Sequence, residues 1–500
     1  MFNNQWFDAM LPSFHTLLAV LWLLPALMHG KLSHHWWQAQ ASAAGGALCA
    51  AMLMAWQGLH AALLFQLLIQ LLAWVILRFS ARYLSGETGQ ARFLRAVGWL
   101  LCGATLVVAS QDWLTLLAGW LLTSPALQSL LTFFPQRPQA RIAARREAVA
   151  SRLAELCLLL AAGLISWAVG SMSFDAVAQP LTSPSAELAR QLGAVLLVGC
   201  VVLKTAQLPF HGWLTQVMEA PTPVSALLHA GVVNLGGMVL IKLSALWSVV
   251  PLASWLLVLW GGLTAGLACW VMQTRISIKL RLAWSTCAQM GFMLMECGLG
   301  QYSLALLHLV THSIYKAHAF LSSGSQVRAT IRQSATPGQH GKLWHAGSGI
   351  AGIALLLVSL QGWQLALGHA LQPPLLLIVV IGLGLAPLCQ RSLRGYAVAL
   401  LLCQVYLLLH TLFATLQADQ ASAPLGCQLL VAALFVALFM LQGWLQHHPD
   451  HALTRRLYAL AFGGLYLDEW WVRTSMRTRL YRLGRLSQPR QQGASAHDHA

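Results

Sequence analysis

The sequence predicts an all-α membrane protein that crosses a bilayer about fifteen times. Charged residues make up 9% of its 500 residues and hydrophobic residues 58%, and the mean hydropathy is +0.64. A soluble globular protein carries about 25% charged residues. Apolar runs recur along the chain, each near the ~20 residues that a helix needs to cross the hydrocarbon core. These observations exclude a soluble protein and predict a polytopic helical one.

The apolar runs define the expected helices and their orientation. They centre on residues 12–30, 38–57, 60–79, 93–110, 113–134, 148–169, 187–208, 222–247, 251–272, 281–298, 302–322, 345–364, 373–390, 395–417 and 425–446. If the first run passes from outside to inside, most of the 30 basic residues fall in inner loops. The positive-inside rule then predicts an outer N-terminus and a cytoplasmic C-terminus. The net charge of +16 is therefore attributed to the cytoplasmic face and not to nucleic-acid binding.

The order of the runs also predicts internal repeats. Runs four to eight and nine to thirteen form two sets of five, and an odd number of helices gives consecutive sets opposite topology. The expected regions are N-terminal helices at 1–92, the first repeat and the start of the second at 93–272, the second inverted repeat at 251–390, C-terminal helices at 391–446, a basic amphipathic segment on the cytoplasmic face at 447–490, and a disordered tail at 491–500. The basic segment is expected to bind anionic lipid or a partner.

One stretch interrupts the apolar pattern with charge and proline. Lys204 lies near the end of one run, and a lysine at bilayer depth costs roughly 2.5–3.5 kcal/mol. Pro209 follows five residues later, and Pro221 and Pro223 precede the next run. Proline removes a backbone donor and breaks a helix. Discontinuous helices with buried ionisable groups are typical of ion sites in transporters.

The sixth run offers Lys204 a partner. Glu155 lies in this run, with Arg152 less than one turn earlier. Glu155 and Arg152 could form a static ion pair. Alternatively, a carboxylate and an ammonium whose separation changes would form a proton switch, because a nearby carboxylate favours the charged lysine and burial disfavours it.

The eleventh run carries a second set of titratable groups. His308, His312 and Lys316 recur every four residues, which places them along one face of a helix. Histidines are suited to proton transfer near neutral pH. The alternative is a set of hydrogen bonds between packed helices. His229, in the eighth run, is expected to bridge Lys204 to this line.

Four further charged residues are possible accessories to an ion path. Arg152 is one of them. Lys242 lies near an outer helix end, where it could simply extend toward water. Lys279 belongs to an inner loop and could mark where protons enter, and Glu296 is expected at a solvated outer end. We find no pattern of a catalytic site or a metal site, and the ten cysteines are expected to be small buried hydrophobic residues.

Five ordered segments resemble the antiporter-like subunits of respiratory complex I and of Mrp-type cation/proton antiporters. The segments are Lys204-Thr-Ala-Gln-Leu-Pro209, Trp213-Leu214, Pro221-Thr-Pro-Val-Ser-Ala-Leu-Leu-His229, Leu282-Ala-Trp-Ser-Thr-Cys-Ala-Gln-Met-Gly291, and His308-Leu-Val-Thr-His312 through Lys316 to Gly324. The resemblance covers about residues 95 to 330. It implies a proton or cation path through Glu155, Lys204, His229, His308, His312 and Lys316.

The chain departs from those relatives at several points. They carry a glutamate directly after a Gly-Trp in the fifth helix, whereas Gly119-Trp120 is followed here by leucine, which leaves Glu155 as the nearest substitute. They carry a lysine or glutamate in the twelfth helix, where this chain has only Gln361 and Gln364. The long lateral helix of the complex I relatives is also missing.

This combination resembles the membrane subunits of DAB inorganic-carbon accumulation complexes, the DabB family. The resemblance implies a bacterial inner-membrane protein that is not an enzyme by itself. It also implies a large soluble partner of the DabA type, similar to a β-carbonic anhydrase, with zinc in that partner and no cofactor in this chain. Cation influx, of protons or Na⁺, would drive CO₂ hydration in the partner, which would dock on the basic inner face and the 447–490 segment.

Two other classes of function remain open. The first is an Mrp-like Na⁺/H⁺ antiporter subunit or a proton-pumping subunit of an NADH dehydrogenase-like complex. The second is a structural membrane anchor. Lys204 and the His308–Lys316 face argue against an anchor, because an anchor has no use for charges that are this costly to bury.

Overall fold

A computed structural model describes residues 16, 18–27, 32–324, 345–367, 373–389, 393–419 and 423–475. Within these residues the regular secondary structure is helical, and only an isolated bridge pairs Asp112 with Ser173. A helix pairs its backbone groups internally, which an apolar environment demands. The predicted all-α fold is confirmed. The expected tail at 491–500 and the end of the basic segment, from residue 476, lie outside the described residues.

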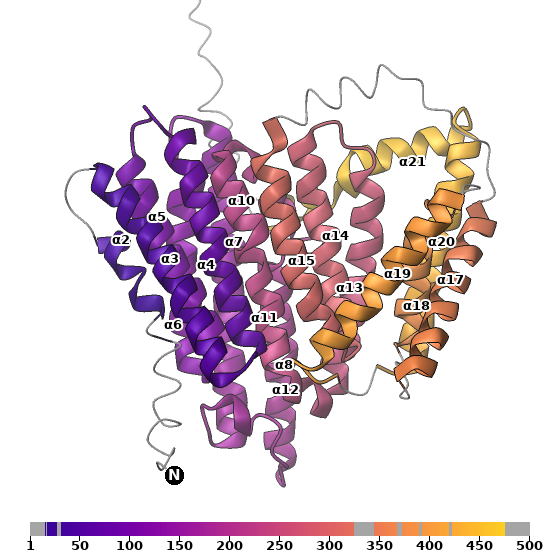
Figure 1. Ribbon diagram of the computed structural model, residues 1–500, viewed down its shortest axis with the longest axis horizontal. Coiled ribbons are helices and arrows are strands. Elements are labelled where there is room, and N and C mark those ends of the chain that lie inside the picture. Colours follow the sequence, from indigo (N-terminus) through magenta and orange to yellow (C-terminus); the bar gives the residue numbers. More distant parts are fainter. Residues whose placement is uncertain are drawn as a thin grey trace, which may run out of the picture.

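Figure 1 labels the helices of the described chain. The α-helices are α2 (Leu23–Leu27), α3 (Leu32–Gln57), α4 (Ala61–Tyr83), α5 (Gln90–Ala109), α6 (Trp113–Leu131), α7 (Pro138–Val169), α8 (Pro184–Lys204), α9 (Gly212–Thr215), α10 (Thr222–Ala230), α11 (Leu235–Lys242), α12 (Ser244–Val249), α13 (Pro251–Met272), α14 (Ile278–Gly298), α15 (Tyr302–Leu321), α17 (His345–Leu367), α18 (Leu375–Leu385), α19 (Leu393–Ala414), α20 (Leu425–His447), α21 (Ala452–Phe462) and α22 (Leu467–Ser475). Short 3₁₀ turns are η1 (Phe174–Ala176), η2 (Val217–Glu219), η3 (Val232–Asn234) and η4 (Gly464–Tyr466).

The helices account for the apolar runs of the sequence. Eleven helices within the described residues are long and apolar enough to cross a membrane. The apolar segments Leu18–Leu27 and Leu375–Leu385 are shorter. Helices α14 and α15 also have membrane-spanning length, and each carries charged or histidine residues within it. Within the described residues the runs correspond to these helices, and the eighth run, at 222–247, contains α10, η3, α11 and α12.

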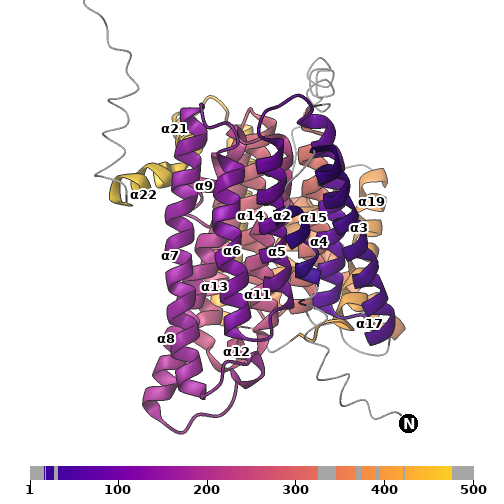
Figure 2. The same cartoon turned by 90° about the vertical axis from the view of Figure 1, so that its left-hand side faces the viewer.

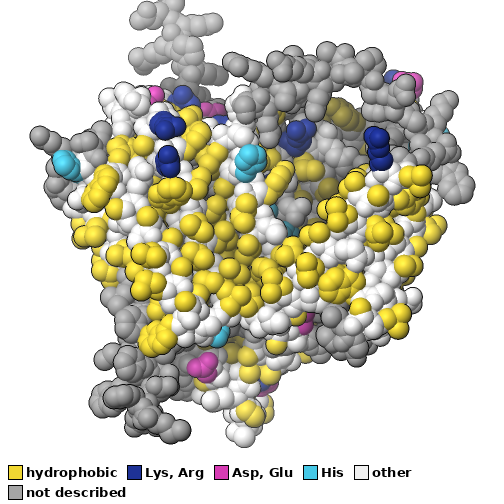
Figure 3. Space-filling view, in the orientation of Figure 1, with side chains coloured by type: hydrophobic (Ala, Val, Ile, Leu, Met, Phe, Trp, Pro, Cys, Tyr) yellow, Lys and Arg dark blue, Asp and Glu magenta, His cyan; other side chains and the backbone are white. Residues whose placement is uncertain are grey.

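The helices stand roughly parallel in a bundle whose sides are apolar. Helices α17 to α20 lie together at one side of the bundle, where α20 packs on α13 and α19 packs on α15 (Figure 1). In the space-filling view, hydrophobic side chains cover the middle of the face, and Lys and Arg lie near the end that carries α21 (Figure 3). An apolar belt with basic residues at one end is the surface expected of a multi-pass membrane protein.

Two pairs of neighbouring helices cross at glycines, one pair in each predicted repeat. A Cβ atom on Gly103 of α5 would lie 2.6 Å from the carbonyl oxygen of Gly119 of α6, and the reverse distance is 2.9 Å. For Gly261 of α13 and Gly291 of α14 the corresponding distances are 2.4 and 2.7 Å. Only glycine allows backbones to approach this closely. The first two helices of each five-helix set therefore pack through the same kind of contact.

The helices around Lys204 are discontinuous. Helix α8 ends at Lys204 itself, and an irregular link with α9 and η2 leads to Pro221, which caps α10, and Pro223 in its first turn. A further break falls at Gly231, between α10 and α11, where no proline stands. The sequence analysis placed breaks only at Pro209, Pro221 and Pro223. The break at Gly231 separates His229 from Asn234 in the middle of one membrane span.

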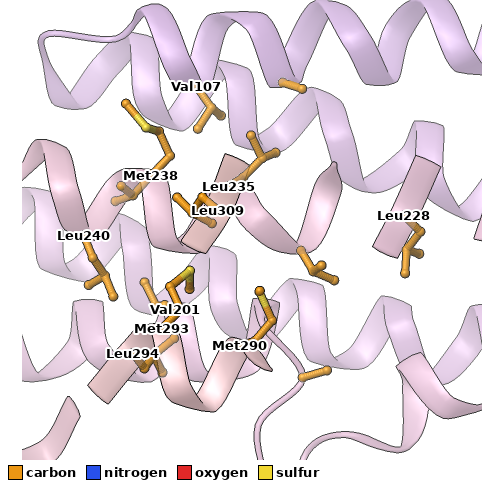
Figure 4. Close-up of a cluster of buried hydrophobic side chains, with 14 of the residues drawn as sticks. Val107, Val201, Leu228, Leu235, Met238, Leu240, Met290, Met293, Leu294 and Leu309 are labelled. Atoms are coloured by element: carbon orange, nitrogen blue, oxygen red, sulfur yellow. The ribbon is translucent and has the colours of Figure 1, made fainter. Parts of the chain in front are cut away.

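A continuous apolar core surrounds this broken helix. Leu235 and Met238 of α11 lie among Leu309 of α15, Met293 of α14 and Val201 of α8 (Figure 4). A Cβ atom on Gly237 would lie 2.1 Å from the Met293 sulfur, which shows how tightly α11 and α14 pack. Polar groups on α10 and α11 are therefore enclosed by protein on all sides.

The C-terminal helices α21 and α22 lie near one end of the bundle, and α22 extends outward past α7 (Figure 2). Arg275 donates hydrogen bonds to the carbonyl oxygens of Ala461 and Phe462, both at 2.9 Å. Asp468 of α22 forms an ion pair with Arg146 of α7. Trp471 packs edge-on against Phe210, with ring centroids 4.6 Å apart. This part of the expected 447–490 segment is helical and is held against the link between α8 and α10.

Candidate functional site

Lys204 lies where α6, α7 and α8 meet. Its ammonium donates hydrogen bonds to the hydroxyl oxygens of Ser124, at 2.8 Å, and Ser151, at 2.9 Å. The Ser151 hydroxyl in turn donates to a carboxylate oxygen of Glu147, whose residue is only 1% exposed. The other Glu147 oxygen has no hydrogen-bond partner among the described residues. A buried ammonium and a buried carboxylate are therefore connected through one hydroxyl.

Glu147 takes the place that the sequence analysis gave to Glu155. Glu155 instead pairs with Arg152, at 2.6 Å, and the Arg152 side chain is 59% exposed. No hydrogen bond joins Glu155 to Lys204 in the part of the chain that the structure describes. Glu147 lies just before the apolar run at 148–169, so hydropathy does not mark it, whereas α7 begins at Pro138 and includes it.

His229 belongs to the second half of the bundle. Its Nδ1 atom lies 3.0 Å from the Thr286 hydroxyl of α14, and its ring stacks on Phe320 of α15 at 4.4 Å. Beyond the break at Gly231, Asn234 donates to Ser313 of α15 at 2.6 Å. The broken helix therefore binds α14 and α15 on both sides of the break. The expected bridge from His229 to Lys204 is not a direct contact among the described residues.

Helix α15 holds the predicted histidine and lysine line inside the protein. Lys316 is fully buried and donates to the carbonyl oxygen of Leu282 at 3.0 Å. The rings of His308 and His312 have centroids 6.1 Å apart, and neither ring nitrogen of His312 has a protein partner among the described residues. Buried polar atoms of this kind usually bind ordered water. The spacing leaves room for a water-assisted line of titratable groups.

Glu296 completes this second cluster. The sequence analysis expected it at a solvated helix end, but it is 5% exposed, and its Oε2 atom lies 2.9 Å from Nδ1 of His308. The difference arises because the end of α14 is covered by neighbouring helices. Each half of the bundle therefore contains a buried carboxylate linked to a partly buried basic group.

The remaining predicted residues lie at the margins of these clusters. Lys242 donates to the Val108 carbonyl oxygen at 2.6 Å, so it is bound within the protein. Lys279 donates to the Thr222 hydroxyl at 2.9 Å, next to the start of α10. The described residues contain no group of three or more His, Cys, Asp or Glu side chains arranged to hold a metal ion.

Gln207 is a polar residue between the two clusters that the sequence analysis did not single out for a role. It is fully buried in the link after Lys204, and its amide oxygen has no hydrogen-bond partner among the described residues. That oxygen would lie 3.1 Å from a Cβ atom on Gly291 of α14. Gln207 therefore reaches from the Lys204 link to the helix that carries Thr286.

Comparisons with known proteins show the family to which the chain belongs. The transmembrane family described as NADH:quinone oxidoreductase/Mrp antiporter matches residues 110–373, which contain both clusters. The probable inorganic carbon transporter subunit DabB of Hydrogenovibrio crunogenus is 37% identical over 425 residues, covering 82% of this chain and 80% of the relative. The probable inorganic carbon transporter subunit DabB2 of Halothiobacillus neapolitanus is also 37% identical, over 435 residues, covering 82% and 78%.

The fold has a solved counterpart. A chain in the structure of the Mrp complex from Dietzia sp. aligns with a TM-score of 0.62 at 20% sequence identity. The alignment covers 97% of this chain and 60% of that chain. At this identity the likeness concerns the fold alone.

Proposed function

Because the chain belongs to the NADH:quinone oxidoreductase/Mrp antiporter family, and to its DabB-type members, we propose that it is the membrane subunit of an energy-coupled complex that accumulates inorganic carbon. The observation that supports ion conduction most strongly is the buried connection from Lys204 through Ser151 to Glu147. A static scaffold has no need of two opposite charges that are costly to bury. An ion-coupled subunit uses such a pair.

The two clusters provide the elements of proton transfer. A nearby carboxylate favours a charged lysine, whereas burial disfavours it. A movement that changes the distance between Glu147 and Lys204 would therefore load or release a proton. Gln207 and the broken helix at Gly231 lie between this pair and the His229, His312 and Lys316 groups, where water would complete the path. Protons are the cation that these side chains suit best, because all of them titrate.

The coupled chemistry belongs to a partner. We assign CO₂ hydration to a large soluble subunit similar to a β-carbonic anhydrase, whose zinc would supply a bound water that is nucleophilic at neutral pH. Cation influx through this chain would make hydration one-way. The partner would dock at the basic end of the bundle, where α21 and α22 lie. This end would face the cytoplasm of a bacterium, with the chain in the inner membrane and the N-terminus outside.

The test is labelled inorganic-carbon uptake in cells that lack carbonic anhydrase and express this chain with its soluble partner. We expect uptake that requires both chains and that is abolished by a protonophore and by Lys204→Ala. The matched control is Asp175→Asn, which removes an exposed charge at the end of the bundle opposite the proposed dock and should leave uptake unchanged. Expression of each variant in the membrane would be measured in parallel.

Absence of uptake with both chains well expressed would contradict the proposal. Na⁺/H⁺ exchange measured in vesicles would then distinguish an Mrp-like antiporter from a proton-pumping subunit. If Lys204→Ala takes up inorganic carbon at the wild-type rate, the carbon function stands and Lys204 is not part of the ion path.

A further inference from the structure

We infer that Tyr406, His410 and Asp419 connect the buried Glu296–His308 pair to the protein surface at the end of the bundle opposite α21, and that they conduct protons. The inference rests on the proposed function and deepens it, because it names the side chains through which the ion reaches the second cluster. The sequence analysis placed none of these three residues on an ion path.

Helix α19 brings these residues to the second cluster. It packs directly against α15, the helix of His308, His312 and Lys316. Tyr406 and His410 are separated by one helical turn and therefore share a face of α19, and their ring centroids are 6.0 Å apart. Asp419 lies beside His410 and also binds Ser303 at the start of α15, so the C-terminal end of α19 and the start of α15 meet at one carboxylate.

His410 and Tyr406 each carry a polar atom that has no hydrogen-bond partner among the described residues. His410 is 4% exposed, and its Nδ1 atom has no hydrogen-bond partner among the described residues. The same holds for the Tyr406 hydroxyl and for Nε2 of His308. Leaving such atoms unpaired costs about 1–3 kcal/mol each, so water is expected beside them. Three such atoms along one route indicate a hydrated connection between α15 and α19.

Asp419 forms the surface end of the route. Its side chain is 25% exposed, and its Oδ2 atom lies 3.6 Å from Nε2 of His410. This distance is within ion-pair range and slightly too long for a direct hydrogen bond, so a small movement of either side chain would bring the two atoms into hydrogen-bond contact. Asp419 also accepts hydrogen bonds from the backbone N–H of Ser303, at 2.8 Å, and from its hydroxyl, at 2.7 Å. These bonds fix the carboxylate at the start of α15 but do not explain the buried His410 behind it.

The groups can pass a proton without net change. A proton from Asp419 binds Nε2 of His410, and loss of the proton from Nδ1 leaves a neutral imidazole. The Tyr406 hydroxyl receives that proton as it gives its own toward Glu296. From the Glu296–His308 pair the line continues to His312 and Lys316. After one transfer the His410 imidazole carries its proton on Nε2, so rotation of the ring and of the Tyr406 hydroxyl must restore the starting orientation before the next proton arrives. No other reactant is needed.

The first test is His410→Ala in the uptake assay of the complete complex. We expect a loss of about tenfold or more, the effect typical of removing a proton-transfer group. Imidazole added outside the cells should restore uptake, because it can replace the missing ring as a proton carrier. His318→Ala is the matched control, since His318 is exposed on α15 and contacts neither cluster among the described residues.

Two further pairs of variants separate a role in proton transfer from a role in the structure. Asp419→Asn keeps an oxygen that accepts from Ser303 but cannot carry a proton, so it should lose uptake, whereas Asp419→Glu should retain it. Tyr406→Phe should also lose uptake, and Tyr396→Phe, at an exposed site of the same helix, should not. These variants decide the question if His410→Ala does not reach the membrane.

The outcomes for this route and for the proposed function differ. If the wild-type complex takes up inorganic carbon and both Asp419→Asn and Tyr406→Phe do so at the same rate, the route is overturned and the proposed function stands. A folded His410→Ala that loses uptake without recovery in imidazole would also overturn it. A wild-type complex without any uptake would overturn both.

Discussion

Residue spacing on α7 determines which carboxylate can reach Lys204. Glu147, Ser151 and Glu155 recur every four residues, so they form one stripe along the helix. Arg152, at a neighbouring position, pairs with Glu155 at the exposed side, and Ser151 links Glu147 to Lys204 inside. Two carboxylates of the same stripe thus have different roles, because only one of them has an exposed cation within reach.

At this scale we predict that Glu147→Gln impairs transport more than Glu155→Gln does. Glutamine preserves the shape and the contact with Ser151, but it leaves the Lys204 ammonium without a compensating charge. Uptake should fall at least ~10-fold, since an uncompensated buried charge costs several kcal/mol. The measurement is the initial rate of uptake per amount of protein in the membrane, with the exposed Glu87→Gln as control. Wild-type rates for Glu147→Gln combined with an inactive Glu155→Gln would return the role to Glu155.

Glycine crossings bring two pairs of neighbouring helices into backbone contact. Gly103 faces Gly119 between α5 and α6, and Gly261 faces Gly291 between α13 and α14. Helix association in lipid relies on close packing, because lipid is as apolar as the side chains it replaces. The Gly291 contact also sets the position of α14, which carries Thr286 and Glu296. These crossings therefore position the second cluster.

At the element scale we predict that Gly261→Leu destabilises the bundle. A Cβ atom alone would lie 2.4 Å from the Gly291 carbonyl oxygen, so α13 and α14 would have to separate. The cost should be about 1–3 kcal/mol or more, seen as a lower melting temperature of the purified protein in detergent. Gly163→Leu on α7 is the matched control, because nothing lies within 4 Å of its Cβ position. Equal melting temperatures for the two variants would show that the crossing tolerates a larger residue.

The two ends of the molecule differ in the charge of their side chains. Basic side chains gather toward the end of α21 and α22 on the face shown in Figure 3, and Arg146 and Arg275 hold the C-terminal helices there. Asp175 lies in the link between α7 and α8, and Asp419 lies in the link between α19 and α20. Both links are at the end of the bundle opposite α21. Such polarity gives the molecule a single favoured orientation in a membrane.

At the scale of the whole molecule we predict that the Asp175 side faces out of the cell. Ser183→Cys, exposed before α8, should react with a membrane-impermeant maleimide in intact cells. Ser85→Cys, exposed between α4 and α5, should react only after the membrane is opened. The unmodified chain, with its ten native cysteines, sets the background. The reverse pattern of labelling would require the opposite orientation and a partner outside the cell.

Hydropathy and helical spacing are local properties, and for that reason the sequence by itself determined the membrane class, the fifteen runs and the shared face of His308, His312 and Lys316. It also located Lys204 beside a broken helix, because proline and a charge in an apolar run are visible without a structure. Glu155 was a reasonable choice of partner only as long as α7 was thought to begin at residue 148.

Only the tertiary structure decided which groups meet. Glu147 reaches Lys204 through Ser151 because α7 is longer than its apolar part and crosses α8 at that point. Glu296 is buried against His308 because other helices cover the end of α14. His410 and Asp419 lie beside the start of α15 because α19 packs on α15, about a hundred residues away in sequence. These contacts depend on how the helices pack. Apolar helix surfaces do not specify by residue type which neighbouring helix they pack against, so the contacts are not predictable from the sequence alone.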